Sequence, residues 1–388
     1  METIRIGDAC EILNGFAFRS ENYVDSGIRI IRIANVQKGF IEDNTPEYYP
    51  ANSTGIDKYM LQEGDLLMSL TGNVGRVAIL DRQFLPAALN QRVACLRLKT
   101  NRISKRYLFH IMNSDFFEHQ CILSSKGVAQ KNMSTEWLKD YEIPLYSAEK
   151  QDEIVSILDN VDEIIASRQS QLFMLDSLIK ARFVEMFGDC RTNPKGWNTV
   201  ALGDIAEVGS SKRVFVEELQ ESGIPFYRGT EVGALAEGKP IEPELFITED
   251  HYKELIDATG KPEIGDLLMP SICPDGRIWV VNTEEPFYFK DGRVLWVHAI
   301  KEKYDPLFLL YTLKDRIMTD YGSIASGTTF AELKIFALKQ CQVFDVPLEE
   351  QQRFATFLSQ VDKSKVVMQA ALKKAQMLFD SLMQLYFV

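Results

Sequence analysis

No run of apolar residues in this sequence approaches the roughly 18 positions that a membrane-spanning helix needs. The six cysteines lie far apart and form no Cys-x-x-Cys pair, which indicates neither a zinc site nor a disulfide scaffold and favours a reducing compartment. The first ten residues, METIRIGDAC, contain acids and no apolar stretch, so we expect no secretory signal. These absences exclude the membrane, secreted and zinc-finger classes and predict a cytoplasmic protein.

Motifs that carry catalysis are also missing. Neither G-x-G-x-x-G nor G-x-x-x-x-G-K-[ST] occurs, so nucleotide phosphates have no standard cradle. H-E-x-x-H and G-x-S-x-G are absent as well, and the four histidines neither cluster nor repeat along the sequence. We therefore expect a non-catalytic chain that binds no metal and no cofactor of its own.

The charge of the chain is acidic overall but unevenly distributed. The formal net charge is −12, which by itself argues against a nucleic-acid binder. Residues 82–131, however, carry nine basic residues against two acidic ones, whereas residues 199–345 carry 15 against 25. A local basic segment matters more for DNA binding than the total charge, although many such segments are only solvated surfaces.

The chain contains two copies of a unit of about 200 residues. Residues 63–80 and 264–281 share seven identities in 18 positions at an offset of 201. The same duplication relates residues 27–32 to 223–228, and residues 158–162 to 358–362. Two copies at so long a period exclude a solenoid of short stacked repeats.

Each copy divides into a mixed part and a helical part. In the mixed part, short β-like runs are separated by Gly, Asn and Pro, which predicts a small α+β globule. In the helical part, apolar residues recur in alternating steps of four and three, which predicts a long helix with a heptad seam. The predicted segments are a first globule over 1–148, a first helix over 149–190, a second globule over 191–345 and a second helix over 346–388.

Two helices with matched seams are expected to pair with each other. An antiparallel coiled coil would place the globules at opposite ends and give a pseudo-twofold molecule. The residues expected along this seam, or in contact with partner subunits, are Ile154, Leu158, Val161, Ile165, Leu172, Leu175, Phe354, Leu358, Val361, Leu372 and Phe379. Apolar residues off the seam predict a docking face for other subunits, unless they pack on the globules instead: Ile164, Phe173, Met174, Phe183 and Phe187.

The polar residues that recur between the copies are arginines. They form the pairs Arg32 and Arg228, Arg76 and Arg277, and Arg92 and Arg293. Arginine without an acid–base partner suits phosphate or guanine recognition better than bond chemistry. For the last two pairs no carboxylate recurs at a matched position, which favours an external anion over an internal salt bridge as their partner.

This layout resembles the specificity subunits of Type I restriction–modification systems. The resemblance covers essentially the whole chain and rests on a Gly-Asp-Leu-Leu-Met run followed by Gly-Arg in both copies, and on the segments TGNVGRVAIL, ALNQRVACL, SSKGVAQKNMS, IPLYSAEKQDEI and DVPLEEQQRF. The second copy departs from the pattern, because it has SICPDGR in place of LTGNVGR and TTFAELK in place of a Gln-Lys-Asn run. Whether both halves read DNA in the same way is therefore open.

A glycine-containing loop of the first copy carries further candidates for DNA contact. Gln and Asn can read adenine bidentately and Lys can contact phosphate, although a solvated turn has the same composition. The candidates on this loop are Lys126, Gln130, Lys131 and Asn132.

The resemblance implies a subunit that reads a split site in double-stranded DNA and docks two methyltransferase subunits, and it allows nuclease subunits to join. S-adenosylmethionine, ATP and Mg²⁺ would then be bound by those partners and not by this chain. One alternative is an orphan or decoy protein that binds methyltransferase subunits without recognising a specific DNA site. A second alternative, a nuclease with an embedded site, is disfavoured by the absence of acidic clusters.

Overall fold

The structure is a computed structural model that describes residues 2–125, 132–327 and 331–387. The chain divides into two compact units. The first unit comprises residues 1–170 and 368–388, and the second unit comprises residues 171–367. Each unit therefore draws on both long helices, α5 (Ala148–Phe187) and α11 (Leu348–Phe387).

The first unit contains two small sheets. The larger is antiparallel with the strand order β2-β8-β5-β6, and the smaller has the order β4-β3-β7, in which β3 and β7 run parallel. A short ribbon joins β1 to β9. The strands are β1 (Thr3–Arg5), β2 (Cys10–Asn14), β3 (Ile28–Ile31), β4 (Tyr48–Tyr49), β5 (Leu66–Ser69), β6 (Val77–Ile79), β7 (Ala87–Leu89), β8 (Val93–Leu98) and β9 (Glu142–Pro144). The helices besides α5 and α11 are α1 (Ile6–Ala9), α2 (Lys105–Met112), α3 (Asp115–Ser124) and α4 (Thr135–Asp140).

The second unit repeats this topology. Its larger sheet has the order β11-β17-β14-β15, its smaller sheet the order β13-β12-β16, and β12 and β16 again run parallel. The strands are β10 (Thr199–Ala201), β11 (Glu207–Gly209), β12 (Ile224–Tyr227), β13 (Phe246–Ile247), β14 (Leu267–Pro270), β15 (Trp279–Val280), β16 (Tyr288–Phe289), β17 (Val294–His298), β18 (Ala325–Ser326), β19 (Glu332–Leu333) and β20 (Gln342–Phe344). The helices are α6 (Leu202–Ile205), α7 (Gly229–Ala236), α8 (Glu249–Thr259), α9 (Pro306–Ile324) and α10 (Ile335–Lys339).

The repeated Gly-Arg sequence marks the same tight turn in both larger sheets. Gly75 and Gly276 both adopt positive φ, at 89° and 68°. A Cβ added at Gly75 would lie 2.9 Å from the Cβ of Cys121, and one at Gly276 would lie 2.9 Å from the Cγ of Lys314. Glycine is the residue that tolerates both the backbone conformation and the close approach.

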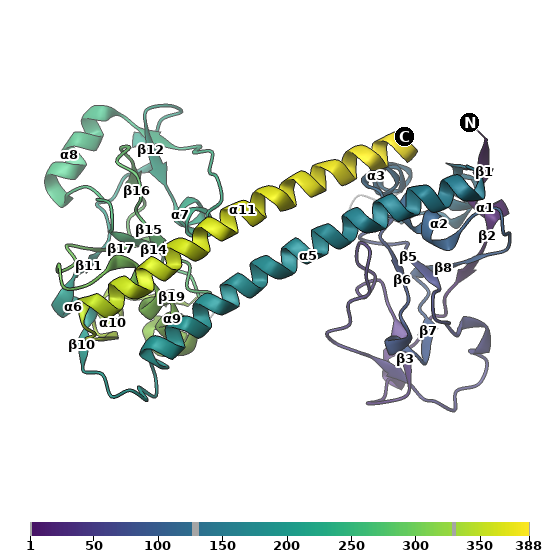
Figure 1. The fold of residues 1–388 in the computed structure, drawn as a ribbon, viewed down its shortest axis with the longest axis horizontal. Coiled ribbons are helices and arrows are strands. Elements are labelled where there is room, and N and C mark those ends of the chain that lie inside the picture. Colours follow the sequence, from purple (N-terminus) through teal and green to yellow (C-terminus); the bar gives the residue numbers. More distant parts are fainter. Residues whose placement is uncertain (1, 126–131, 328–330, 388) are drawn as a thin grey trace. The chain divides into compact units, whose positions relative to one another are not determined.

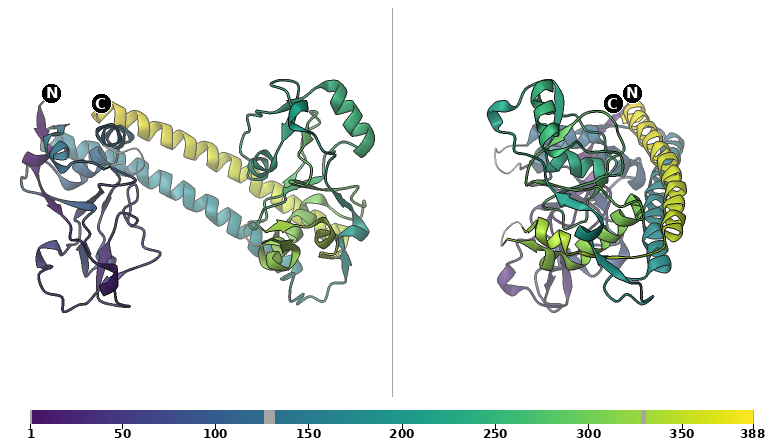
Figure 2. Two further views of the ribbon diagram at one scale, coloured as in Figure 1. Left: turned by 180° about the vertical axis from the view of Figure 1, so that it is seen from behind. Right: turned by 90° about the vertical axis from the view of Figure 1, so that its left-hand side faces the viewer.

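Each unit uses the start of one long helix and the end of the other (Figures 1 and 2). In the first unit, Ile154 and Leu158 near the start of α5 share a core with Met383 and Phe387 at the end of α11. In the second unit, residues near the start of α11 share a core with the end of α5; these residues are Ile179, Phe183, Phe187, Phe354, Leu358 and Val361. Start packs against end in both units, which is the order of contacts in an antiparallel helix pair.

A buried glutamine ties each long helix to its globule. Gln151 donates to the backbone oxygens of Arg102 and Tyr146 at 2.8 and 2.9 Å and accepts from the Ser104 amide at 2.9 Å. Gln351 makes the corresponding bonds in the second unit, to the backbones of Lys303, Val346 and Asp305. These duplicated bonds give a structural reason for the glutamine that recurs at the start of each long helix. The predicted α+β class, with two mixed globules each followed by a long helix, is confirmed.

Candidate nucleic-acid interface

Arg32 and Arg228 follow the first strand of the smaller sheet in their units, and both are held by local carboxylates. An Arg32 Nη1 atom lies 3.4 Å from Glu47, and an Arg228 Nη2 atom lies 3.2 Å from Glu244. Both glutamates follow a proline, at positions 46 and 243, so the ion pair is duplicated together with the fold. A structural role therefore explains why this arginine pair recurs, and the assignment of these residues to DNA contact stays a prediction.

Arg228 is also bound by the buried Glu231 at 2.6 Å. Burial opposes ionisation of Glu231, but hydrogen bonds from Arg228 outweigh it and lower the pKa of this carboxyl to about 2. The glutamate is therefore charged at neutral pH and fixes the guanidinium beside the N-terminus of α7.

Arg76 and Arg277 lie after the repeated glycine turn and have partners of different kinds. Arg76 donates to the Oε1 atom of Gln37 at 2.6 Å and lies 3.9 Å from Glu118. Arg277 lies 2.8 Å from Asp275. The sequence argument against internal ion pairs therefore does not hold for these two arginines, because their carboxylates stand at positions that are not equivalent.

Arg92 and Arg293 occupy equivalent places, just before β8 in the first unit and just before β17 in the second. The backbone oxygen of Arg92 accepts from Leu70 at 3.0 Å, and that of Arg293 accepts from Ser271 at 2.8 Å. Both side chains are exposed, but only Arg293 has an acidic partner, Glu332. Within the described part of the chain no carboxylate pairs with Arg92. The argument against an internal partner thus holds for Arg92 and is wrong for Arg293.

The structure brings the three predicted arginines of the second unit to one cleft of about 570 Å³. Lys290, at the end of β16, and Ser271, at the end of β14, line the same cleft and were not predicted from the sequence. The signal that could have found Lys290 is its place three residues before Arg293, the arginine that recurs between the copies. A concave surface with several cations and hydroxyls can bind the acceptor oxygens of DNA.

Only part of the predicted glycine loop belongs to the described residues. Lys126, Gln130 and Lys131 lie outside the described residues. Asn132 is exposed, and its Oδ1 atom accepts from the Thr71 hydroxyl at 2.8 Å. This bond ties the residue after the loop to the end of β5.

The predicted seam residues are buried or half-buried in their units. Among the residues predicted for a docking face, Ile164, Phe173 and Met174 are exposed, with 73% of Phe173 accessible. Phe183 and Phe187 are buried in the core of the second unit, so their prediction as docking residues is wrong. The physical reason is that the end of α5 packs on a globule as well as on α11, which requires a wider apolar face than a coiled-coil seam.

Each unit has a hollow between the end of a long helix and its globule. In the first unit the hollow measures about 560 Å³ and is lined by Phe379 and Met383 of α11 together with Phe116. In the second unit it measures about 490 Å³ and is lined by Ile179 and Phe183, the residues 200 positions earlier. The hollow is therefore duplicated with the fold.

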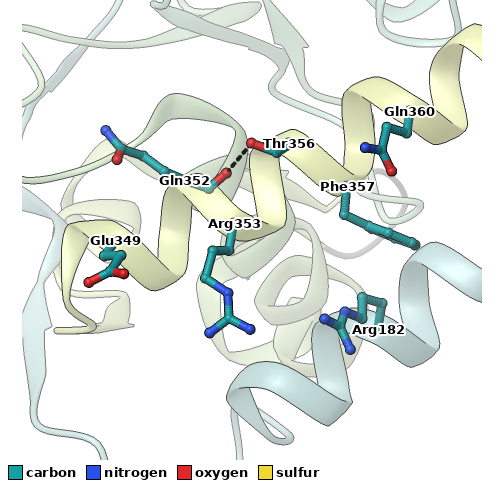
Figure 3. A pocket seen from close by; sticks show the side chains of 7 residues that line it. All are labelled: Arg182, Glu349, Gln352, Arg353, Thr356, Phe357 and Gln360. Atoms are coloured by element: carbon teal, nitrogen blue, oxygen red, sulfur yellow. Dashed lines mark hydrogen bonds between the residues drawn. The ribbon is translucent and has the colours of Figure 1, made fainter.

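A further hollow of about 440 Å³ lies on the helices of the second unit. In Figure 3, Arg182 of α5 lies beside Phe357 of α11, and the guanidinium carbon is 5.9 Å from the ring centroid. Arg353 and Gln352 extend from the neighbouring turn of α11, and the Thr356 hydroxyl donates to the backbone oxygen of Gln352 at 2.8 Å. The surface is polar around one aromatic ring, as is common where helices meet a partner protein.

One group of side chains in the first unit has the composition of a metal site. The Nε2 atom of the buried His110 lies 2.7 Å from Asp159, and Asp162 is close to both. Burial lowers the pKa of His110 and raises the pKa of Asp162. Arg106 lies 2.7 Å from Asp159 and supplies positive charge to this group, so an ion pair accounts for the arrangement without a metal ion.

The duplicated mixed fold, with a long helix after each copy and an arginine just before β8 and β17, defines a protein built from two copies of one module. The chain belongs to the family described as the Type I restriction modification DNA specificity domain, which matches residues 1–172 and again residues 194–375. It is thus a specificity subunit, the non-catalytic component of a restriction–modification system.

Curated relatives agree with this assignment. The chain is 26% identical over 370 residues to the putative type I restriction enzyme MjaX specificity subunit of Methanocaldococcus jannaschii, covering 89% of this chain and 79% of that protein. It is 30% identical over 193 residues to the type I restriction enzyme EcoAI specificity subunit of Escherichia coli, covering 46% of this chain and 33% of that longer protein.

The crystal structure of the type I restriction–modification S subunit from M. genitalium matches the fold. The TM-score is 0.57 at 15% identity, with 100% of this chain and 96% of that chain covered. A structure described as the basis of complex assembly and conformational transition of the type I R-M system matches with a TM-score of 0.58 at 18% identity, over 99% and 96% of the two chains. Among the described residues, none of the helices has the length and apolar character needed to cross a membrane.

Proposed function

We propose that this specificity subunit reads a bipartite site in double-stranded DNA, one half with each globule. The observation that carries the proposal is the duplicated strand end at which Arg92 lies in the first unit and Arg293, with Lys290, lies in the second. A shared anchor with changed surroundings is what two readers of different half-sites require. The basic segment over 82–131 adds attraction for DNA in the first unit.

The helices are proposed to dock two methyltransferase subunits. The duplicated hollow supports two equivalent docking places, because its lining includes exposed apolar side chains in each unit, Phe116 in the first and Val184 and Met318 in the second. The exposed Phe173 and Met174 and the Arg182–Phe357 surface add further area for docking. S-adenosylmethionine would be bound by the methyltransferase subunits, and ATP with Mg²⁺ by nuclease subunits where these join.

The test is methylation by the assembled complex. The chain is co-purified with methyltransferase subunits, the complex acts on a library of random DNA, and the methylated molecules are sequenced. We expect two fixed half-sites separated by a spacer of constant length and free sequence. A complex that forms but methylates without sequence preference would favour the decoy alternative, and failure to form a complex would contradict the docking proposal.

Arg92 gives the sharpest single-residue test of the first unit. If its guanidinium contacts a phosphate, Arg92→Ala weakens binding about equally on all sequences and lowers the salt slope of binding by about one unit. If it reads guanine, one position of the first half-site relaxes at a cost of about 1–3 kcal/mol. Lys139→Ala serves as the control, because this lysine lies beside Gly7, which precedes the β2 residue that pairs with Leu98 at the other end of β8. Unchanged affinity and salt slope in Arg92→Ala would remove this residue from the interface.

A further inference from the structure

The positions around Arg92 and Arg293 can be matched between the two units by their backbone hydrogen bonds. The amide of Asn90 donates to Ile31, and that of Lys290 donates to Tyr227, at 3.1 and 2.9 Å. The carbonyl of Asn90 accepts from the amide of Val93, the first residue of β8, at 2.9 Å. The carbonyl of Lys290 accepts from the amide of Val294, the first residue of β17, at 3.1 Å. Lys290 therefore occupies the place of Asn90, and the second unit has one additional residue between this position and its arginine.

Glu332 is matched to Asn132 in the same way. The residue after each of them donates its amide to the end of the second strand of the larger sheet: Met133 to Leu70 at 2.9 Å, and Leu333 to Ser271 at 2.7 Å. Two uncharged residues of the first unit, Asn90 and Asn132, are thus replaced by a cation and an anion in the second unit.

These two replacements change which cation is free. In the first unit, Arg92 has no acidic partner among the described residues. In the second unit, Glu332 pairs with Arg293, and its side chain is only 27% exposed. An arginine neutralised in this way adds little net attraction for a phosphate, and a carboxylate at the same edge repels one.

The other arginines of the second cleft are neutralised as well. Arg228 pairs with Glu231 and Glu244, and Arg277 pairs with Asp275. Lys290 lines the same cleft and pairs with no carboxylate among the residues that the structure describes. Among the described residues of the lining, it is the one lysine or arginine that contributes an uncompensated positive charge.

We propose that Lys290, and not Arg293, supplies the cation with which the second globule contacts an acceptor oxygen of DNA. Glu332 is a positioning residue that holds Arg293 in an ion pair. The proposal rests on the proposed function, because it takes DNA as the ligand of this cleft. The chemistry of the contact is a lysine ammonium donating to a phosphate oxygen or to the O6 atom of guanine. The duplicated strand end thus carries the same task on different residues in the two units.

The experiment compares single variants in the complex with methyltransferase subunits. DNA affinity is measured over a range of salt, and the methylated sequences are read from a random library. Lys290→Ala is expected to lower the salt slope by about one unit on all sequences if it contacts phosphate, or to relax one position of the second half-site if it contacts guanine. Arg293→Ala is expected to leave the slope unchanged. Lys261→Ala, an exposed lysine outside the cleft, is the matched control.

A gain-of-function variant separates this proposal from a loss of folding. Glu332→Asn restores the residue of the first unit and frees Arg293 together with Lys334, whose ammonium lies 3.5 Å from Glu332. It is therefore expected to raise the salt slope by at least about one unit. The double variant Lys290→Asn with Glu332→Asn reproduces the arrangement of the first unit and is expected to recover the binding lost in Lys290→Asn.

Two results would overturn the proposal. One is a reduced salt slope in Arg293→Ala with no change in Lys290→Ala, and the other is no change in either variant or in Glu332→Asn. A wild-type complex without sequence preference would instead refute the proposed function itself, so the two failures are distinguishable.

Discussion

Phe187 belongs to the helix that follows the first globule, yet its ring completes the core of the second unit. It is fully buried, and its ring centroid lies 4.8 Å from that of Phe308 and 5.6 Å from that of Phe354. We therefore expect Phe187→Ala to destabilise the second unit and to leave the sheets of the first unit unaffected.

The size of this effect follows from the burial. Truncating a buried phenylalanine to alanine costs about 3–5 kcal/mol through lost transfer energy and the cavity left behind. Because the contacts with Phe308, Phe354 and Phe183, whose ring centroid lies 5.2 Å away, are lost as well, we expect about 4 kcal/mol for Phe187→Ala. That cost corresponds to roughly a thousandfold lower protection against hydrogen exchange for amides that exchange through opening of the unit.

Hydrogen exchange read by mass spectrometry resolves the two units. Peptides from β14 and β17 should lose protection in Phe187→Ala, whereas peptides from β5 and β8 should not. Phe173→Ala on the same helix is the control, because its side chain is 73% exposed and its loss should cost no more than about 0.5 kcal/mol. Loss of protection confined to β5 and β8, or equal in both sheets, would refute the packing described above. Phe387→Ala should show the reverse pattern, since Phe387 packs 5.6 Å from Tyr107 between ring centroids.

Three other predictions concern buried polar groups. Gln351→Ala should lower the free energy of unfolding in urea by about 2–3 kcal/mol because it leaves three backbone groups without partners. The exposed Gln352→Ala should leave that free energy unchanged; equal losses in the two variants would contradict the role of the Gln351 hydrogen bonds. The pKa of Glu231 is lowered from 4.5 to about 2, so its contribution to stability is full above pH 4.5 and is lost as the pH falls toward 2; Glu231→Gln should flatten this acid dependence, and a parallel curve would argue against it. All six cysteines are buried and free, and burial raises the pKa of Cys10 to about 12; a thiol reagent at pH 8 should therefore react only after denaturation, and rapid labelling of the native protein would contradict the burial.

Duplication and heptad spacing allowed the architecture to be predicted from the sequence. The seam residues Ile154, Leu158 and Phe354 are buried in their units as predicted, because apolar residues at heptad spacing lie on one face of a helix. The same reasoning missed the burial of Phe187, because a helix that packs on a helix and on a globule buries two faces, and only one of them has heptad spacing.

The interface was predicted less completely because ion pairs depend on tertiary contacts. Arg293 and Glu332 are 39 residues apart in the sequence, and no local pattern connects them. The duplicated ion pair of Arg32 with Glu47 had a signal in the sequence, because the Pro-Glu of residues 46–47 recurs at residues 243–244. That this glutamate pairs with the arginine becomes clear only in the fold, where strand β3 brings the two side chains together. The DNA-contact residues therefore stay predictions, and their partners in the structure decide which of them to test first.

The exchange of helix ends has a consequence for synthesis on the ribosome. The Tyr146 hydroxyl of the first unit donates to the backbone oxygen of Tyr386, which is translated 240 residues later. Until α11 has been made, the apolar side chains around Tyr107 that pack against Met383 and Phe387 are exposed to solvent, and they can aggregate or bind chaperones. The second globule, in contrast, receives its Phe187 before its own sheets emerge. The order of translation thus makes the half that is synthesised first the half that matures last.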